Sequence, residues 1–303
     1  MNRKNKKILY WILGLIASVS SLFAYGQLKP DNSQEISGYT YDTDTLAVHF
    51  LNVGNADCIL LQYNEHTMLI DSGEKEDGAE ICSYLTSQGI EQINTMILTH
   101  PDADHIGGAK EVMDYAGVSD KIYMTNYVKD SKTYKKLMTN IKKTGNTVIF
   151  PDIGESFSFG PCKVEFLGPA DTYSDSNSMS LVCKLTYGET SFLFTGDCSK
   201  EAEKDILKNI NSSQLKVDVL KVGHHGSKYS TSKSFLEAVR PSYGIISCDV
   251  QSEYGHPHDD TMKRLNQANV RVYRTDKNGT IVAQSDGSKI VFYTQTTNQE
   301  EAK

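Results

Sequence analysis

The sequence predicts a mixed α/β domain in which two β-sheets pack face to face beneath outer helices. Short apolar segments typical of strands alternate with helix-period segments from residue 45 to residue 294 without a break. The two halves of this stretch repeat the same order, strands followed by helices. At about 250 residues, the stretch is the size of one large domain. We therefore expect a single α/β domain over residues 45–295.

The first half begins with three short strands. Residues 47–53, 58–63 and 67–70 are apolar runs, each closed by turn residues, and this pattern is typical of a meander. Helices and further strands follow in alternation: helices at residues 79–88 and 106–115, strands at residues 95–99 and 121–125.

The second half repeats this alternation. We expect strands at residues 162–167, 180–185, 191–195 and 217–222, and helices near residues 200–210, 233–239 and 261–267. The stretch closes with a pair of apolar segments, 280–284 and 289–293, separated by the turn residues of a hairpin. Two strand-rich halves with helices on the outside favour a sandwich of two helix-covered sheets.

Both ends of the chain differ from this domain. Four basic residues precede an uncharged apolar run over residues 8–25, which predicts a signal peptide or a membrane anchor within residues 1–26. Poor matches to a small-residue cleavage site favour the anchor, and the basic residues before it place the domain outside the cytoplasm, secreted or membrane-anchored. We expect residues 27–44 to form a polar linker and residues 296–303 a tail.

The charge balance argues against general adhesion to nucleic acid. The chain has 31 Lys and Arg against 38 Asp and Glu, a net charge of −7. The segment from Lys121 to Lys143 differs, because it has seven Lys and only one acidic residue, Asp130. This segment is either a solvated helix face or a groove that binds successive phosphates.

The densest chemical signal is a run of six residues that directly follows the apolar run 95–99. It contains four strong metal ligands, His100, Asp102, Asp104 and His105. Imidazole nitrogen combined with carboxylate oxygen suits Zn²⁺, Mn²⁺ or Fe²⁺. The alternative is that acidic and histidine residues simply cluster in a solvated loop, but four such ligands at a strand end favour a metal site.

Further ligands follow other predicted strands. Asp197 comes after an apolar run and a glycine, His224 and His225 lie between two glycines after another run, and a later loop adds His256 and His258. Glycines beside ligands let the backbone turn tightly. Ligands at several strand ends of one sheet edge can converge on a single site.

At these residues the chain resembles the metallo-β-lactamase fold superfamily, which carries H-x-[HD]-x-D-H after a strand, then a later Asp and His. Within it, the segments 99–108, 194–197, 220–227 and 254–258 are similar to the extracellular hydrolase domain of the ComEC/Rec2 competence proteins. Choline-phosphate esterases that act on teichoic acid are the nearest competing branch. The resemblance spans about residues 45–293 and implies an αββα sandwich.

The resemblance also implies the roles of the ligands. His100 and Asp102 would hold one divalent ion, Asp104 and His105 the second, and Asp197 would bridge the two. His225 would complete the second position, with His224 as its substitute. The first position lacks a histidine that many members carry midway, where this chain has Asn177, and His258 or His256 would fill it. Asp71 corresponds to a structural aspartate beneath the site.

From the resemblance we expect a hydrolase with two ions, Zn²⁺ or Mn²⁺, that acts on DNA or another phosphodiester. Asp104 and Asp197 are the predicted catalytic residues, and Lys228 is a candidate phosphate contact. Two ions can stabilise the attacking and leaving oxygens of an in-line displacement. Asp102 stands where lactamases have a second histidine, which disfavours β-lactams as substrates.

Two alternatives stay open. One is hydrolysis of phosphocholine or another cell-wall ester, and the other is a membrane-tethered binding module without turnover. The chain departs from the family at Asn55 and Ala56, where relatives commonly have Gln-Gly, and it lacks the multi-span membrane region of full competence channels. We therefore do not expect it to form a DNA channel itself, and the sequence identifies no protein partner.

Overall fold

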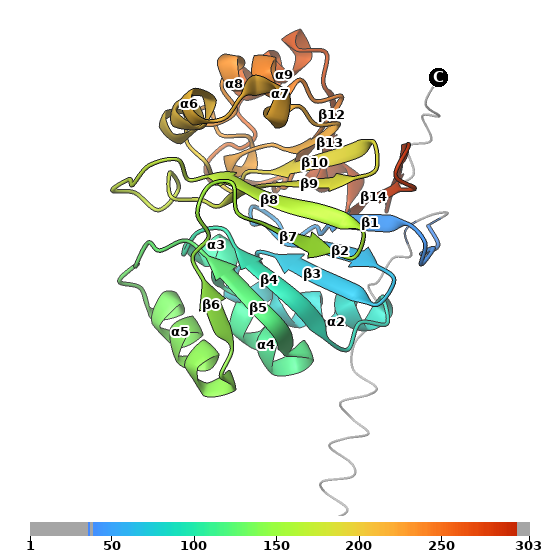
Figure 1. Ribbon diagram of the computed structural model, residues 1–303, viewed down its shortest axis with the longest axis vertical. Helices are drawn as coiled ribbons and strands as arrows, with labels where there is room; N and C mark the ends of the chain where they lie inside the picture. Colours follow the sequence, from blue (N-terminus) through green and yellow to red (C-terminus); the bar gives the residue numbers. More distant parts are fainter. Residues whose placement is uncertain (1–35, 37–38, 296–303) are drawn as a thin grey trace, which may run out of the picture. The chain divides into compact units, whose positions relative to one another are not determined.

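A computed structural model describes Ile36 and residues 39–295. All of these belong to one compact unit, Glu35–Lys303. Two sheets lie at its centre (Figure 1). The first has eight strands in the order β15-β14-β1-β2-β3-β4-β5-β6, and the second has seven in the order β13-β12-β11-β10-β9-β8-β7.

The strands of the first sheet are β1 (Leu46–Phe50), β2 (Ile59–Tyr63), β3 (His66–Ile70), β4 (Ile93–Leu98), β5 (Val118–Met124), β6 (Thr147–Ile149), β14 (Ile281–Ser285) and β15 (Ile290–Thr294). Those of the second are β7 (Ser156–Phe159), β8 (Cys162–Gly168), β9 (Val182–Tyr187), β10 (Thr190–Phe194), β11 (Val219–Lys221), β12 (Tyr243–Ile246) and β13 (Arg271–Arg274). The α-helices are α2 (Gly78–Ser87), α3 (Ala103–Ile106), α4 (Ala109–Ala116), α5 (Lys132–Thr144), α6 (Lys200–Asn209), α7 (Ser212–Leu215), α8 (Lys233–Val239), α9 (Asp259–Gln267) and α10 (Thr275–Asn278), with 3-10 turns η1 (Lys75–Asp77) and η2 (His224–Gly226).

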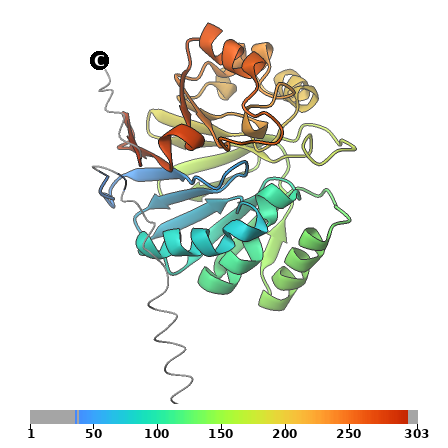
Figure 2. The ribbon, with the colours of Figure 1, turned by 180° about the vertical axis from the view of Figure 1, so that it is seen from behind.

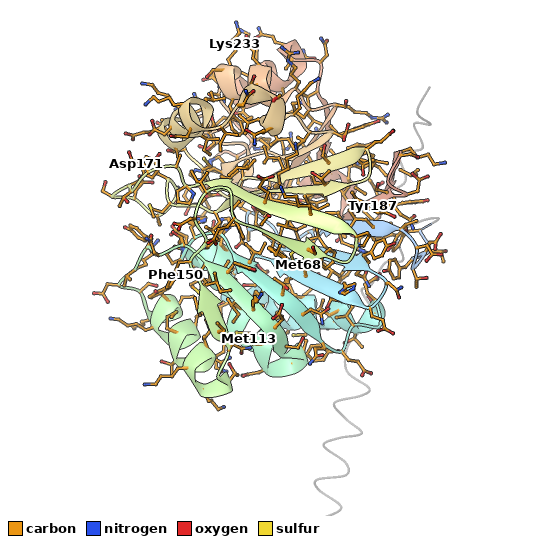
Figure 3. All side chains as sticks on the ribbon, viewed as in Figure 1. Met68, Met113, Phe150, Asp171, Tyr187 and Lys233 are labelled. Carbon is orange, nitrogen blue, oxygen red and sulfur yellow. The ribbon has the colours of Figure 1, made fainter. Side chains whose placement is uncertain are left out.

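Three buried clusters hold the layers together. The inner cluster lies between the two sheets and includes Phe50, Met68 and Phe192. A second cluster, with Met113, packs α2, α4 and α5 against the outer face of the first sheet, and a third packs α6, α8 and α9 against the second sheet (Figures 2 and 3). Alternate residues along a strand face opposite sides, so strands covered on both faces are apolar throughout. The predicted sandwich of two helix-covered sheets is confirmed.

The predicted meander is confirmed as well, because β1, β2 and β3 pair antiparallel in order. The closing hairpin, however, does not extend the sheet of the second half. Its strand β14 pairs antiparallel with β1, with Leu46 opposite Ser285 and Phe50 opposite Ile281. The first sheet therefore joins the two ends of the domain.

The helix predicted over residues 106–115 corresponds to α4, which begins later, at Ala109, and the short helix α3 precedes it. Gly107 and Gly108 separate them at a close approach of backbones. A Cβ atom on Gly108 would lie 2.4 Å from the carbonyl oxygen of Ser72, and one on Gly107 would lie 2.4 Å from the nitrogen of Lys75. Only glycine permits this approach, which brings α3 against the end of β3.

Within the part of the chain that the structure describes, no helix is long and apolar enough to cross a bilayer. The apolar run 8–25 and the tail 296–303 lie outside the described residues. Their predicted roles stay predictions.

Candidate metal centre

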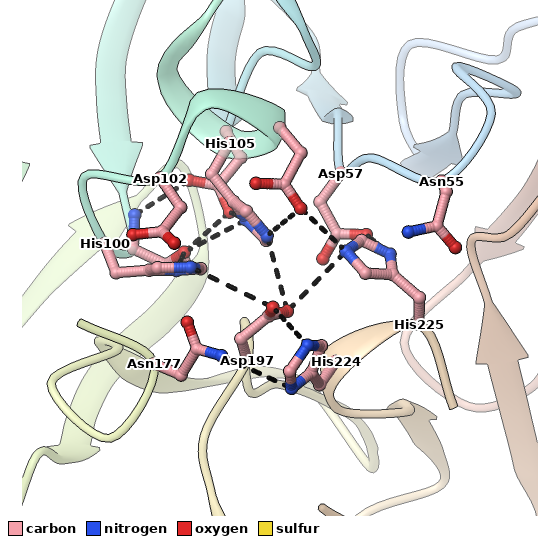
Figure 4. A network of polar contacts seen from close by, with 12 residues as sticks. Asn55, Asp57, His100, Asp102, His105, Asn177, Asp197, His224 and His225 are labelled. Atoms are coloured by element: carbon pink, nitrogen blue, oxygen red, sulfur yellow. Dashed lines mark hydrogen bonds and ion pairs between the residues drawn. The ribbon is translucent and has the colours of Figure 1, made fainter. Parts of the chain in front are cut away.

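The candidate ligands gather where strands of the two sheets end side by side. His100 follows β4, Asp197 follows β10, and His225 follows β11. A backbone hydrogen bond from Leu181 N to Thr99 O, 2.9 Å long, links the segments beside these strand ends, and another from His224 N to Gly196 O, 3.0 Å long, joins the two loops of the second sheet. The predicted convergence of strand-end residues is thus visible in the close-up of the site (Figure 4).

The short helix α3 positions two of the ligands. Asp102 is its extended N-cap residue, so the chain turns into the helix directly after the strand, and Asp104 and His105 lie in its only turn. The amide nitrogen of Ile106 donates to Asp102 O at 3.0 Å, which closes this turn. A six-residue segment can therefore present ligands to two different positions.

Four of these residues form one compact set of donor atoms, Asp104, His105, Asp197 and His225. Nε2 of His105 lies 3.3 Å from Oδ1 of Asp197 and 3.6 Å from Oδ2 of Asp104. Nε2 of His225 lies 3.8 Å and 3.3 Å from the same two oxygens. Ligands around a tetrahedral ion at about 2.1 Å lie roughly 3.4 Å apart, so this spacing fits one Zn²⁺-sized ion.

The hydrogen bonds of the two imidazoles leave their inner nitrogens free for an ion. Nδ1 of His105 lies 2.8 Å from Oδ2 of Asp71, and Nδ1 of His225 lies 3.1 Å from the carbonyl oxygen of Ser247. Both outer partners are acceptors, so each Nδ1 carries the proton and each Nε2 directs a lone pair inward. Both Nε2 atoms and Oδ1 of Asp197 are buried without a hydrogen-bond partner. Lone pairs that face one another in a buried site favour a positive charge between them, and these residues form a candidate metal site.

Electrostatics give the same picture. Burial alone would raise the pKa of Asp197, but the neighbouring imidazoles, His105 first, hold that pKa well below its usual range. Burial likewise works to lower the pKa of His105, yet the surrounding carboxylates, Asp197 first, raise it well above its usual range. The cluster therefore favours added positive charge at its centre.

A second position lies on the other side of Asp197. Oδ2 of this carboxylate is 3.9 Å from Nε2 of His100 and 3.4 Å from Nε2 of His224. Nδ1 of His100 contacts the hydroxyls of Thr99 (3.1 Å) and Ser180 (3.2 Å), and its buried Nε2 has no hydrogen-bond partner. His100 therefore also directs an unpaired nitrogen inward.

The structure places His224 opposite His100, on the side where the sequence predicted a missing histidine. Nδ1 of His224 lies 3.4 Å from Nδ2 of Asn177, so Asn177 contacts the imidazole directly. Asp102 lies beside His100 (Figure 4), and its Oδ1 pairs with Nζ of Lys129 at 2.6 Å. The prediction of His224 as a substitute for His225 differs from this arrangement, because the two imidazoles face different oxygens of Asp197.

Consecutive left-handed residues separate those two imidazoles. His224 and His225 both have φ of 51°, an uncommon value for residues other than glycine, and two in succession are strained. Their glycine neighbour Gly226 has φ of 82°, and a Cβ there would lie 2.5 Å from Pro257. This backbone directs adjacent side chains to opposite sides of Asp197.

The site lies at the bottom of an open cavity of about 1070 Å³. His256 lines this cavity and its ring centroid is 5.3 Å from that of His224. His258 and Lys228 are not among the lining residues. Nδ1 of His258 instead accepts a hydrogen bond from the backbone nitrogen of Lys228 at 3.1 Å, and the Lys228 ammonium lies over the ring of Tyr229, 5.3 Å from its centroid.

Sequence reasoning missed a buried ion pair beside the site. Nζ of Lys221 lies 2.9 Å from Oδ1 of Asp57, and both side chains are almost completely buried. The same oxygen is 3.6 Å from Nδ1 of His225. Burial works to raise the pKa of Asp57, but the Lys221 ammonium lowers it. The position of Lys221 inside the apolar run of β11 could have indicated this pair, because buried lysines are almost always paired with an acidic group.

The fold and the donor set together define a class of protein, a two-sheet α/β protein with a candidate metal site of histidine and aspartate at its strand ends. The chain belongs to the metallo-beta-lactamase superfamily, whose family model matches residues 51–249. Members of this superfamily are generally metal-dependent hydrolases.

Two curated relatives are similar to the chain over much of its length. ComE operon protein 3 of Bacillus subtilis is 35% identical over 199 residues, 65% of this chain and 25% of the relative. Recombination protein 2 of Haemophilus influenzae is 30% identical over 257 residues, 82% of this chain and 29% of the relative. The predicted resemblance to the ComEC/Rec2 proteins is confirmed, although the chain spans less than a third of the length of either relative.

Among solved structures, the fold is shared with the metallo-beta-lactamase fold protein YhfI of Bacillus subtilis. The TM-score is 0.54 at 13% identity, and the match covers 80% of this chain and 100% of that chain. At this identity the likeness establishes the fold alone.

Proposed function

We propose that this protein is a two-metal phosphodiesterase whose substrate is DNA. The observation that carries the proposal is the pair of ion positions on either side of Asp197, with inward-facing imidazole nitrogens that have no other partner. Two ions separated by such a bridge stabilise the attacking and leaving oxygens of a phosphodiester when bound. The similarity to Recombination protein 2 supports DNA as the substrate.

In this proposal each ion position has its own residues. His100, Asp102 and His224 would hold the first ion, Asp104, His105 and His225 would hold the second, and Asp197 would be shared by both. Mn²⁺ or Zn²⁺ would fit this mixture of nitrogen and oxygen donors. Asp71 and the Ser247 carbonyl fix the tautomers of His105 and His225, so the chain supplies a preorganised pair of positions.

The reaction is a hydrolysis in which the oxygen of water forms a bond to phosphorus while a P–O ester bond breaks. The proton from water passes to the departing alcohol. The chain contributes the negatively charged floor of the cavity, which retains the ions, and Lys129 at its edge, the only Lys or Arg among the described residues that line it. Asp104 is partly exposed to this cavity, so substrate can reach the ions from solvent.

The test compares the purified full-length chain with its Asp197→Ala variant on linear DNA in the presence of Mn²⁺ or Zn²⁺. We expect metal-dependent cleavage that falls at least a hundredfold in the variant, because both ion positions lose a ligand. A second variant, Asp120→Ala, removes an exposed carboxylate of β5 that does not line the cavity, and this matched control should leave cleavage intact. Equal cleavage by the Asp197 variant would refute the two-metal scheme.

One observation favours a second candidate, hydrolysis of a cell-wall ester with a cationic group such as phosphocholine. Several carboxylates line the cavity, among them Asp249 and Glu253, and the exposed ring of Tyr254 stacks on His256 with centroids 5.6 Å apart. Acidic and aromatic groups together bind quaternary ammonium ions. Release of choline phosphate from teichoic acid without cleavage of DNA would establish this candidate instead.

A non-catalytic binding module is the alternative from another class. Binding alone does not need every ligand of two ion positions, and the chain retains His100, Asp104, Asp197 and His225 in contact distance. We therefore favour an enzyme. The apolar run 8–25 supports the further proposal that the catalytic unit is secreted or membrane-anchored and acts outside the cell.

A further inference from the structure

Charged side chains are distributed unevenly around the cavity above the candidate metal centre. Six carboxylates that are not candidate ligands line it and form what we call the carboxylate wall: Glu74, Glu76, Asp77, Glu80, Asp249 and Glu253. A seventh, Asp276, is neutralised by Arg274, whose Nη2 lies 2.6 Å from Oδ2 of the carboxylate. A phosphate chain therefore meets repulsion on the wall. At Lys129 it meets an ammonium that lies 2.6 Å from Oδ1 of Asp102 and would be shared between that carboxylate and a phosphate.

The wall and Lys129 belong to opposite ends of the site. Oγ of Ser252 donates to Oδ1 of Asn55 at 3.1 Å, which holds the loop with Asp249 and Glu253 beside Asn55. Figure 4 shows Asn55 at the His225 end of the network and Asp102, the partner of Lys129, at the His100 end. The backbone nitrogen of Gly73 donates to Asp57 O at 2.8 Å, and Oδ1 of Asp57 lies 3.6 Å from Nδ1 of His225, so the segment that begins with Glu74 follows on from the His225 end.

Further lysines follow Lys129 along the chain, on the helix α5. Lys129 lies in the loop before α5, and five lysines of α5 follow it on an exposed surface: Lys132, Lys135, Lys136, Lys142 and Lys143. Among these five lysines, only Lys135 forms an ion pair with a described residue, Asp130. The candidate phosphate-binding segment, Lys121 to Lys143, is therefore connected through Lys129 to the His100 end of the site and not to the wall.

We propose that Lys129 binds the phosphate next to the scissile one and that the carboxylate wall admits only a group without further phosphates. This inference rests on the proposed function and refines it, because a strand can then extend from the site in one direction only. Cleavage is restricted to phosphodiester bonds close to a strand end, so the enzyme is an exonuclease.

The first experiment gives the full-length chain with Mn²⁺ two single-stranded DNA substrates of the same sequence, one linear and end-labelled, the other a closed circle. We expect the linear strand to shorten from one end with release of mononucleotides or very short products. The circle, which has no end, should be cut at least tenfold more slowly. Equal rates on the two substrates would overturn the inference and leave the proposed nuclease function standing.

The second experiment measures Lys129→Met on the linear strand. We expect KM to rise about tenfold with a smaller change in kcat, because one charge-assisted phosphate contact is lost. The slope of log K against log salt should decrease by about 0.7 for a single strand. Lys163→Met is the matched control, since Lys163 is a lysine that also forms an ion pair, with Glu165 at 2.9 Å, but lies on β8. A change no larger than the control's would overturn the assignment of Lys129.

The third experiment neutralises part of the wall in the triple variant Glu80→Gln, Asp249→Asn, Glu253→Gln. We expect cleavage of the circular strand to increase at least tenfold relative to the linear strand, because phosphates can then pass on both sides of the ions. An unchanged ratio would contradict the role of the wall. If the wild-type chain cleaves neither strand under any metal, the proposed function itself fails, which these comparisons distinguish from failure of the exonuclease inference alone.

Discussion

Asp71 illustrates how single residues set up the candidate metal centre. It lies beneath the site with φ of 57°, and its carboxylate accepts hydrogen bonds from the backbone nitrogen of Thr99 (2.8 Å), from the Thr99 hydroxyl (2.7 Å) and from Nδ1 of His105 (2.8 Å). The sequence predicted a structural role for this residue, and the contacts show which groups it orients.

We predict that Asp71→Asn lowers metal affinity by about 10- to 100-fold without unfolding the protein. Asparagine tolerates the left-handed backbone, but its NH₂ group cannot accept the proton of His105 Nδ1. The imidazole would then present a protonated Nε2 to the ion. Competition with a chelator measures the affinity, and circular dichroism checks the fold. Unchanged affinity in a folded variant would show that the carboxylate does not orient His105.

His49 is buried far from the ligand set in the sequence and has a different role. Its Nδ1 lies 2.8 Å from the hydroxyl of Tyr84, its Nε2 lies 3.2 Å from that of Tyr39, and burial lowers its pKa to about 3. The folded state therefore holds a neutral imidazole, whereas the unfolded chain takes up a proton near pH 6.5. Its contribution to stability is present above that pH and is lost as the pH falls towards 3.

From this shift we predict that the metal-free protein loses about 3 kcal/mol more stability between pH 7 and pH 4 than its His49→Gln variant does. Urea unfolding followed by circular dichroism at several pH values, with chelator present, measures the difference. Parallel pH profiles for the two proteins would mean that His49 is protonated in the folded state.

At the scale of elements, the junction between α3 and α4 determines how the ligand loop is held. The sequence predicted that the helix begins at residue 106, because the apolar period covers residues 106–115. Gly107 and Gly108 interrupt it only because the backbone at residues 72–75, distant in sequence, approaches closely. Local periodicity does not contain such tertiary contacts.

We predict that Gly108→Ala destabilises the protein by about 2 kcal/mol or more, since its methyl group would collide with the Ser72 carbonyl. Gly145→Ala is the comparison, because a Cβ there meets no atom within 4 Å and only its left-handed backbone opposes the change, at about 1 kcal/mol. Denaturant unfolding of both variants without metal ranks them. A smaller loss for Gly108→Ala than for Gly145→Ala would contradict the close packing.

At the scale of the whole domain, the sequence predicted the two sheets better than their pairing. Apolar runs such as β2 and β10 are buried on both faces and were found from composition, whereas β13, with the sequence RVYR, lacks a clear apolar pattern. The pairing of β14 with β1 joins residues more than 200 positions apart. Strand choice depends on local pattern, but pairing depends on the packing of the complete chain.

The candidate site also combines features that the local sequence predicts with features that depend on the packing of the complete chain. The ligand types at strand ends were evident from the sequence, because histidines and aspartates there have no packing role. The opposite orientations of His224 and His225 depend on two left-handed residues in succession, and the Lys221–Asp57 pair depends on contact between the two sheets. Neither follows from spacing along the chain.

The central claim is that two ions lie on either side of Asp197. Anomalous X-ray diffraction from crystals of the protein grown with Mn²⁺ tests it most directly. We predict two anomalous peaks about 3.5–4 Å apart, with Asp197 between them, as expected for a two-metal hydrolase. A single peak, or two peaks that do not share Asp197, would contradict the account.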